Sequence, residues 1–566
     1  MKTASKTKRI LCLILSAVLI FSLIGCGNKT NVNSDQSNVE AGNNSNASSG
    51  DSSNTGSNSV SSNNSNNNSN NNSSTNASSS TAAKPVLLNP GNWSVVAKAD
   101  MPARQDSTLT LAEMQKLYRP HTEWRIYDIR TTKTTVKTKN GGTAYYVSNK
   151  GKNSNDGLSP ETPFATPANL GKVKLKAGDV VYFERGSVFR GTWTFMVEGV
   201  TYSAYGEGKK PEFYGSPKDY ADPKLWKETD VKGIYVCTEM VLKDVGGVIY
   251  NEDQSATRVT VGSNGIFEGE QFKSYKDMKK DLYFYYDKAK AKLYFRCNAG
   301  NPGKVFKRIE LNTAGTVISI RANNITLDNL CVKYGGGHGI GLSGNYTGLT
   351  IQNCEIGFIG GCVHSETADG WAIRFGNGVE VWGGTENFTI KNSYFYDIFD
   401  AAMTFQYGTS TNPPPETIVK NVNFSNNVIE RCTYSIEYFL ASGPNSYIEN
   451  MTIANNLMWY TGEGYCFKRY GENEDAHIKS WECDNFIRGY YNITNNLFAM
   501  SQAYLVQTWT GSVETAKYDS NIYIQRANKL LGVNGKMSQK IRFNFNVKNE
   551  IKNKLHDNNA TVIMVR

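Results

Sequence analysis

The sequence predicts an all-β protein whose main body is a right-handed parallel β-helix, a solenoid of short stacked strands. Three observations predict this fold. A phrase of alternating apolar and polar residues that ends in Asn recurs between Asn323 and Gln507, with successive copies 24 to 40 residues apart. Repeats of this length indicate a solenoid. Each copy has the period of two that is typical of strands, and the region carries no long helical pattern.

Recurrent asparagines mark the same turn in successive coils. They are Asn329, Asn353, Asn392, Asn426, Asn455 and Asn495. A strand of four or five residues cannot bury its apolar face alone, so the copies must stack, each coil contacting mainly its neighbours. Stacked strands lie about 4.8 Å apart. One Asn per coil is therefore predicted to form a ladder of amide hydrogen bonds along the turn.

The N-terminal residues are typical of an export signal. Basic residues within 1–9 precede an apolar run from Ile10 to Ile24 that is too short for a membrane-spanning helix. The run ends in Leu23-Ile24-Gly25-Cys26, which resembles the bacterial lipobox. That resemblance implies cleavage after residue 25 and diacylation of Cys26, and two acyl chains are enough for stable anchoring. We expect the protein on the extracellular face of the bacterial cell membrane; an ordinary secretory signal is the alternative.

The remaining chain divides by composition. Residues 26–83 are nearly all Asn, Ser, Gly and Thr and cannot bury enough apolar surface to fold, so we expect a flexible tether. Val547, Ile551 and Leu555 are spaced by four and predict a helix over the last coil. The predicted segments after the tether are an N-terminal extension (84–143), a cap with the first coils (144–218), a small inserted antiparallel β module (219–308), the main β-helix (309–525) and a C-terminal cap (526–566).

Composition argues against several classes of function. Beyond Cys12 and Cys26, the cysteines are scattered without metal-ligand spacing, so we expect small buried hydrophobic residues rather than metal ligands. The net charge of +10 is dispersed, which argues against a nucleic-acid partner. The chain has no phosphate-binding Gly-Lys-Ser/Thr loop, no His-Glu-x-x-His and no Gly-x-Ser-x-Gly. We expect a monomer that requires no cofactor, with calcium left open.

Acidic residues between apolar or small neighbours form the predicted catalytic set. They are Glu380, Asp400 and Glu437, on neighbouring coils. Asp400 and Glu463 each follow a recurrent Asn by eight residues, so an undistorted stack would hold them in one column about 9–10 Å apart. Carboxyl groups several ångströms apart suit glycoside hydrolysis, in which one donates a proton and the other acts as base or nucleophile. Repulsion and burial would keep one of them protonated.

Polar and aromatic residues near these acids are predicted to bind the substrate. Basic and aromatic groups together suit a sugar ring that carries a carboxylate or several hydroxyls. The predicted substrate-binding residues are His338, Arg374, Trp382, Gln406, Glu463, Lys468, Arg469, His477 and Trp481.

Two stretches resemble known protein families. From Tyr145 to Phe183, a strand, an Asp-Gly loop, a short helical stretch and a second strand resemble the start of secreted β-helix proteins of the pectate-lyase-like superfamily. From Tyr334 to Trp481, phrases such as Gly376-Asn377-Gly378-Val379-Glu380 and Ser435-Ile436-Glu437-Tyr438 resemble glycoside-hydrolase-like β-helix proteins secreted by Gram-positive bacteria. The resemblance implies the fold more firmly than the reaction, because such solenoids host hydrolases, lyases and esterases. Phe405 stands where a polar Asn is expected, which weakens Gln406 as a substrate contact.

Three functions follow as hypotheses. The first is a surface-anchored glycoside hydrolase that cleaves a polysaccharide with Glu380, Asp400 and Glu437. The second is a polysaccharide lyase that acts on a uronic-acid polymer, with Lys468, Arg469 or His477 as the base and calcium held by carboxylates. The third is a carbohydrate-binding surface protein without catalytic activity.

Overall fold

The computed structural model describes residues 96–259, 266–267, 270–313, 315–366, 372–408, 414–466, 475–481, 487–489, 491–508, 516–532 and 541–566. The predicted signal peptide, the lipidation site Cys26 and the tether lie outside these residues. Within the described chain, none of the helices is both long enough and apolar enough to span a membrane.

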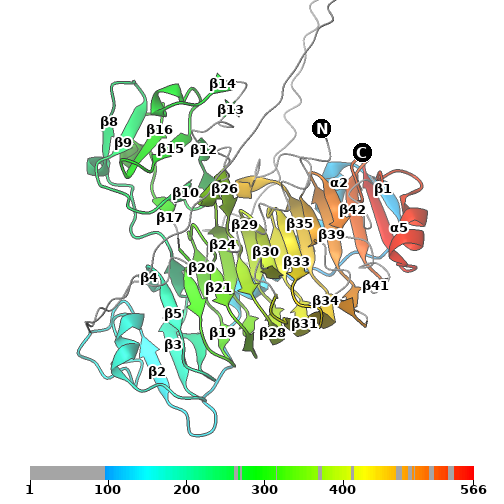
Figure 1. The fold of residues 1–566 in the computed structure, drawn as a ribbon, viewed down its shortest axis with the longest axis horizontal. Coiled ribbons are helices and arrows are strands. Elements are labelled where there is room, and N and C mark those ends of the chain that lie inside the picture. Colours follow the sequence, from blue (N-terminus) through cyan, green and yellow to red (C-terminus); the bar gives the residue numbers. More distant parts are fainter. Residues whose placement is uncertain are drawn as a thin grey trace, which may run out of the picture. The chain divides into compact units, whose positions relative to one another are not determined.

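The main body is a right-handed parallel β-helix built from three parallel sheets, as the sequence predicts (Figure 1). Each coil runs from a strand of sheet B through a turn to sheet A, then to sheet C and on to the next coil. In Figure 1 the coils follow one another from β3 to β42. The interior is apolar, lined by inward-facing residues of all three sheets such as Ile351, Ile356 and Val379, each fully buried.

The strands of the three sheets, in hydrogen-bonded order, are as follows. Sheet B contains β2 (Ala144–Val147), β3 (Val180–Glu184), β6 (Thr201–Tyr205), β19 (Thr326–Asp328), β23 (Thr350–Gln352), β28 (Thr385–Lys391), β31 (Ile418–Ser425), β34 (Tyr447–Ala454), β38 (Tyr491–Thr494) and β41 (Ala516–Asp519); β22 (Tyr346–Thr347) and β37 (Ile487–Arg488) pair with β28 and β34. Sheet A contains β1 (Ser107–Leu109), β43 (Thr561–Val565), β42 (Ile522–Arg526), β39 (Leu497–Ser501), β35 (Leu457–Thr461), β32 (Val428–Glu430), β29 (Tyr394–Ile398), β24 (Glu355–Ile359), β20 (Cys331–Lys333), β7 (Glu212–Tyr214) and β4 (Val188–Arg190). Sheet C contains β40 (Tyr504–Gln507), β36 (Ala476–Ser480), β33 (Tyr434–Ala441), β30 (Ala401–Gly408), β27 (Val379–Trp382), β21 (Ile340–Ser343), β18 (Ile318–Ile320) and β5 (Trp193–Phe195).

The recurrent asparagines occupy the turn between sheets B and A, as predicted. All six have a left-handed backbone, with φ between 48° and 58°, a conformation that Asn tolerates better than most residues. The predicted ladder on these asparagines is wrong, because in the later coils the inward-facing residue that follows the turn forms it. Asn427 Nδ2 donates to Asn456 Oδ1 at 3.0 Å, and the chain of bonds continues through Asn496 and Asn521 to Asp557.

Breaking this inner ladder should destabilise the solenoid. Asn456→Ala removes the acceptor of the Asn427 backbone N–H and one of the two acceptors of its side-chain amide. We therefore expect the free energy of unfolding to fall by about 2–3 kcal/mol. Urea unfolding followed by circular dichroism measures it. Asn423→Ala, on the outer face of β31, is the control and should change stability by less than about 0.5 kcal/mol. Equal effects of the two substitutions would contradict the structural role of the ladder.

The N-terminal extension forms two elements that the sequence analysis did not predict. Strand β1 pairs in parallel with β43 at the C-terminal end of sheet A. Helix α2 (Leu111–Thr131) follows directly, starting at a capping box in which Thr110 and Glu113 bond each other's backbone N–H groups. Its apolar residues Met114, Tyr118 and Ile126 pack with the outward-facing residues of sheet A. Helix α2 therefore covers the outer face of this sheet.

Buried ion pairs fasten α2 to sheet A. Arg130 donates from Nε and Nη2 to the two carboxylate oxygens of Glu355, at 3.1 and 3.0 Å. Arg119 pairs with Glu430 farther along the sheet. Burial alone would raise the pKa of both carboxyls, but the arginines outweigh it; with Lys333 beside Glu355 and Arg431 beside Glu430, they lower each pKa to about 2.

These ion pairs predict loss of stability in acid. The folded pKa of Glu355 and Glu430 lies below the ordinary value, so their contribution is complete above about pH 4.5 and is lost as the pH falls toward 2. The urea midpoint should therefore drop steeply between pH 4.5 and 3. Glu355→Gln should lower the midpoint at pH 7 and flatten this dependence. An equally steep dependence in that variant would show that other groups cause the acid sensitivity.

The inserted module interrupts the coils between sheet A and sheet C. Its larger sheet contains β12 (Thr257–Val259), β15 (Tyr283–Asp287), β16 (Lys292–Arg296), β9 (Ile234–Cys237) and β8 (Trp226–Glu228), all antiparallel except the pair β12 and β15. A second sheet contains β11 (Gln254–Ser255), β10 (Val245–Tyr250) and β17 (Ile309–Thr313), and β13 (Ile266–Phe267) pairs with β14 (Glu270–Gln271). The fold class thus matches the prediction, module included.

Helical segments complete the chain. The predicted C-terminal helix is α5 (Val547–Leu555), and its residues Val547, Ile551 and Leu555 are buried in the core of the last coils. The short helices are η2 (Pro167–Lys172) in the N-terminal cap, η3 (Pro223–Leu225), η4 (Tyr275–Asp277) and α3 (Pro302–Val305) in the module, and η5 (Gly464–Cys466) beside sheet A.

Candidate functional site

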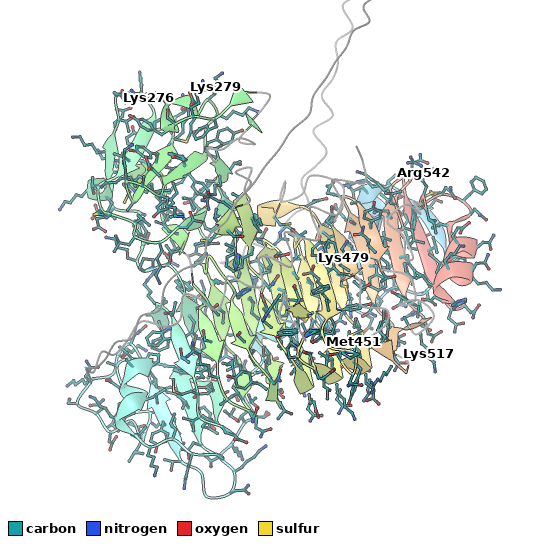
Figure 2. The ribbon with its side chains drawn as sticks, viewed as in Figure 1. Lys276, Lys279, Met451, Lys479, Lys517 and Arg542 are labelled. Atoms are coloured by element: carbon teal, nitrogen blue, oxygen red, sulfur yellow. The ribbon has the colours of Figure 1, made fainter. Side chains whose placement is uncertain are left out.

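The outer face of sheet C carries one column of polar side chains across five neighbouring strands. In register, Glu380 of β27 pairs with Thr404 of β30, Thr404 with Glu437 of β33, Glu437 with Lys479 of β36, and Lys479 with Gln507 of β40. The residues before and after them, such as Met403 and Phe405, belong to the apolar core. Because side chains alternate along a strand, the polar column faces outward. We name it the sheet C column; Figure 2 labels its member Lys479.

Glu380 is buried in a cluster of hydrogen-bond donors and histidines. It is 6% exposed, its Oε2 lies 2.7 Å from His338 Nδ1, and Asn377 Nδ2 donates to the same oxygen at 2.8 Å. Burial raises the pKa of Glu380, but the charge and hydrogen bond of His338, the hydrogen bond of Asn377 and the charge of His364 outweigh it and lower the pKa below the ordinary value. Glu380 is therefore held ionised, as a general base requires.

Glu437 accepts side-chain hydrogen bonds on both carboxylate oxygens. It is 5% exposed; Gln406 Nε2 donates to its Oε2 at 2.9 Å and Trp481 Nε1 donates to its Oε1. Both donors come two residues after a member of the column, on the side where the strands of sheet C lead toward sheet B. Gln406 is thus a partner of a candidate catalytic acid rather than an isolated substrate contact, despite the apolar Phe405 beside it.

Aromatic rings line the same edge of sheet C. Trp382, Gln406 and Phe439 occupy one register position on neighbouring strands, and Trp481 follows β36 one strand farther along. These three aromatic residues are half-buried. Lys479 Nζ lies 3.9 Å from the centre of the Trp481 ring and donates to Gln507 Oε1 at 2.6 Å. Half-buried aromatic rings beside carboxylates suit the apolar faces and hydroxyls of sugars.

A hairpin beside β27 carries a second histidine toward Glu380. It consists of β25 (Cys362–Glu366) and β26 (Ala372–Phe375). The Phe375 ring centre lies 5.1 Å from that of His338 and 5.0 Å from that of His364. Burial, followed by the charge of His338, lowers the pKa of His364. The sequence analysis missed His364, which stands in an ordinary alternating strand pattern.

The inserted module fastens this hairpin. Arg258 pairs with Asp244 at 2.7 Å and donates to Gly361 O at 3.3 Å. The backbone N–H of Val363 donates to Asp244 Oδ2 at 2.7 Å. Arg374 donates from Nε to the same Gly361 carbonyl at 2.6 Å, and burial lowers its pKa to about 10. Arg374 thus binds backbone carbonyls instead of being presented to a substrate, which revises its predicted role.

Asp400 lies next to the sheet C column but not in it. It directly precedes β30, is 6% exposed, and its carbonyl accepts hydrogen bonds from the N–H groups of Thr433 and Tyr434. The register gives Asp475 the equivalent place before β36, because Ala401, Tyr434 and Ala476 are aligned. The predicted column of Asp400 and Glu463 is therefore wrong. Residues 464–475 separate Glu463 from β36, whereas Asp400 directly precedes β30.

Glu463 and Asp475 contact the following coil. Gln502 Nε2 donates to Glu463 Oε1 at 2.9 Å, and burial raises the pKa of Glu463. Asp475 accepts the Ser501 hydroxyl at 2.7 Å and the N–H groups of Gln502 and Ala503 at 3.1 Å. Burial raises the pKa of Asp475 to about 6. Both acids stabilise the turn that leads into β40.

His477 is not accessible to a substrate. It is fully buried, with Nδ1 3.1 Å from Ser435 Oγ and Nε2 3.1 Å from Ala499 O. Burial lowers its pKa to about 3. The predicted role of His477 as a substrate contact or lyase base is therefore wrong, because its ring bonds protein groups on both sides. Lys468 and Arg469, the other predicted bases, lie outside the described residues.

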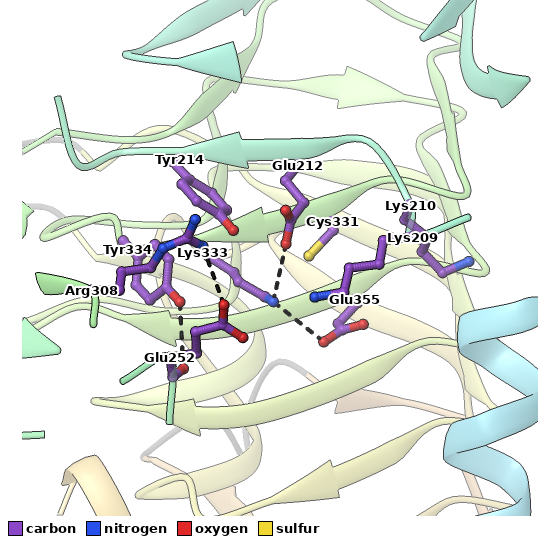
Figure 3. Close-up of a pocket in the computed structure, with 10 residues that line it drawn as sticks. All are labelled: Lys209, Lys210, Glu212, Tyr214, Glu252, Arg308, Cys331, Lys333, Tyr334 and Glu355. Atoms are coloured by element: carbon purple, nitrogen blue, oxygen red, sulfur yellow. Dashed lines mark hydrogen bonds and ion pairs between the residues drawn. The ribbon is translucent and has the colours of Figure 1, made fainter. Parts of the chain in front are cut away.

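A second cluster of charges lies on the outer face of sheet A and is a packing feature (Figure 3). Lys333 Nζ stands 3.4 Å from Glu212 Oε1 and 3.7 Å from Glu355 Oε1. The cavity that these residues line with Tyr334 measures about 20 Å³, which is room for about one water molecule. Over the part of the chain that is described, no group of three or more His, Cys, Asp or Glu side chains is placed to hold a metal ion.

Comparisons with known proteins give remote structural likenesses. No family model matches the chain, and no curated protein sequence matches it. Three similar solved structures are XylC with xylose (14% identity, TM-score 0.39, 69% of each chain covered), a glycoside hydrolase (9%, 0.41, 68% of this chain and 88% of that chain) and pectate lyase Pel9A (12%, 0.35, 72% and 75%). Likenesses at this level assign no family and no activity to the chain.

Proposed function

We propose that this protein is a carbohydrate-active enzyme of the bacterial cell surface, a glycoside hydrolase that cleaves a polysaccharide. Glu380 and Glu437 are its acid/base pair. The observation that carries the proposal is their placement: two buried carboxylates face outward from one column, two strands apart, in different surroundings. Pairs of carboxyls with contrasting environments are what glycoside hydrolysis uses.

The surroundings of Glu380 assign its role. His338 and Asn377 keep Glu380 ionised, so it is the base, and the remaining role, donation of the proton, falls to Glu437. Trp382, Phe439 and Trp481 bind sugar faces beside the pair. Asp400, which directly precedes the intervening strand β30, supports the pair electrostatically. In this proposal the enzyme acts as a monomer without a required cofactor, and the lipid at Cys26 and the tether hold it at the membrane.

The test is a glycan screen with product analysis. The mature chain carrying Cys26→Ser, which prevents lipidation, is incubated with a panel of neutral and acidic polysaccharides, and new reducing ends and ultraviolet absorbance are both measured. Hydrolysis produces reducing ends without absorbance. A lyase acting on a uronic-acid polymer would produce an unsaturated, absorbing product and would overturn the proposal. Tight glycan binding with neither signal would support the carbohydrate-binding alternative.

A further inference from the structure

Thr404 is a buried hydroxyl between the two proposed catalytic carboxylates. It is the register partner of Glu380 on one side and of Glu437 on the other. The side chain is fully buried, and its Oγ1 has no hydrogen-bond partner among the described residues. Leaving a buried hydroxyl unpaired is costly, so a group that completes its hydrogen bonding is expected at this place. The hydroxyl faces outward because Met403 and Phe405 both face the core.

The strand spacing sets the separation of the two carboxylates on either side of Thr404. Neighbouring strands lie about 4.8 Å apart, so residues two strands apart in one column are roughly 9–10 Å apart. Retaining glycosidases, in which one carboxylate attacks the sugar directly, hold their carboxyls about 5–5.5 Å apart. Inverting glycosidases hold them about 6.5–9.5 Å apart, because a water molecule must fit beside the base. The spacing of Glu380 and Glu437 therefore favours the inverting arrangement.

We infer that the enzyme hydrolyses its glycoside with inversion at the anomeric carbon, and that the Thr404 hydroxyl holds the attacking water beside Glu380. This inference rests on the proposed hydrolase function. The water oxygen forms the new bond to the anomeric carbon while its proton passes to the Glu380 carboxylate. The bond to the leaving oxygen breaks, and that oxygen takes the proton of Glu437. Exchange of one proton with solvent returns both carboxyls to their starting states.

The first test is the configuration of the product. Proton magnetic resonance of the earliest product, recorded with the glycan that the screen identifies, should show the anomer opposite to that of the substrate linkage. A product of the same configuration would overturn the inference while leaving the hydrolase function intact. If Glu380→Gln and Glu437→Gln both left activity unchanged, the proposed function itself would fail. The two failures are therefore distinguishable.

The second test distinguishes the role of the Thr404 hydroxyl from that of the shape of the side chain. Thr404→Val keeps the shape and removes the hydroxyl, so we expect kcat to fall roughly 10- to 100-fold with little change in KM. Thr404→Ser should restore most of the rate. Thr389→Val, an outward-facing threonine on sheet B, is the matched control and should retain full activity. Full activity of Thr404→Val, or equal losses for the valine and serine variants, would contradict the role.

A crystal structure of the mature Cys26→Ser chain provides a readout that needs no substrate. At high resolution we expect an ordered water within hydrogen-bond distance of Thr404 Oγ1 and a Glu380 carboxylate oxygen, absent in Thr404→Val. If the wild-type structure showed the hydroxyl bonded to a protein group instead, the inference would be wrong. This measurement decides the question even when the glycan screen finds no substrate.

Discussion

Glu437→Gln and Glu380→Gln are each expected to lower kcat by about 10²–10⁴-fold on the natural glycan, with KM little changed. Each amide keeps the shape of the carboxyl but can neither deliver nor accept the proton. The two variants should differ on an activated aryl glycoside. Its leaving group needs no protonation, so Glu437→Gln should regain much of its rate there. Glu380→Gln should stay slow until a small anion such as azide replaces the activated water.

The control for both variants is Glu386→Gln. Glu386 is an exposed glutamate of β28 on sheet B, away from the sheet C column, and its loss should leave kcat and KM unchanged. Reversed behaviour on the aryl glycoside, with Glu380→Gln restored and Glu437→Gln slow, would exchange the two roles. Wild-type rates in both variants would leave only a binding function for this face.

Arg130→Met is expected to lower the free energy of unfolding by about 3–5 kcal/mol, because it leaves the buried Glu355 carboxylate without its bidentate partner. Lys333 remains 3.7 Å from Glu355 and still neutralises part of its charge. The loss in the free energy of unfolding should therefore lie near the lower end of this range. Urea unfolding at pH 7, followed by circular dichroism, measures the change. Helix α2 should also become sensitive to limited proteolysis at lower urea concentrations than the coils.

Lys133→Ala is the matched control near the end of the same helix. Lys133 pairs with Glu207, but both side chains are largely exposed, and such surface pairs contribute about 0–1 kcal/mol. We therefore expect almost no change in stability. A loss in Lys133→Ala as large as that in Arg130→Met would indicate that the N-terminal segment is held by general charge attraction rather than by the buried pair.

Much of the candidate site follows from repeated short phrases in the sequence. Four phrases each place a polar residue between two inward-facing neighbours, all of them apolar except Ser480: Val379-Glu380-Val381, Met403-Thr404-Phe405, Ile436-Glu437-Tyr438 and Ile478-Lys479-Ser480. Aligning these phrases would have found Thr404 and Lys479, which the sequence analysis missed. Counting from the recurrent asparagines could not, because the distance varies: Glu437 lies 11 residues after Asn426, whereas Glu380 lies 27 residues after Asn353.

That variation comes from the turn between sheets A and C. In one coil the turn contains the hairpin of β25 and β26, and in another it contains η5 and the chain that leads to β36. A count along the chain therefore matched Asp400 with Glu463, although the strand register matches Asp400 with Asp475. The same limit applies to His477. Whether its ring faces the interior depends on the local path of the chain at the start of β36.

The sequence by itself determined the coil: asparagines suited to a left-handed turn and strands of alternating polarity are local features, and each copy repeats them. Only the tertiary structure decided what covers and connects the coils. Helix α2 binds Glu355 and Glu430, more than 200 residues away in the chain, and Asp244 and Arg258 hold a hairpin beside Glu380. Such contacts depend on distances in space that no local pattern encodes.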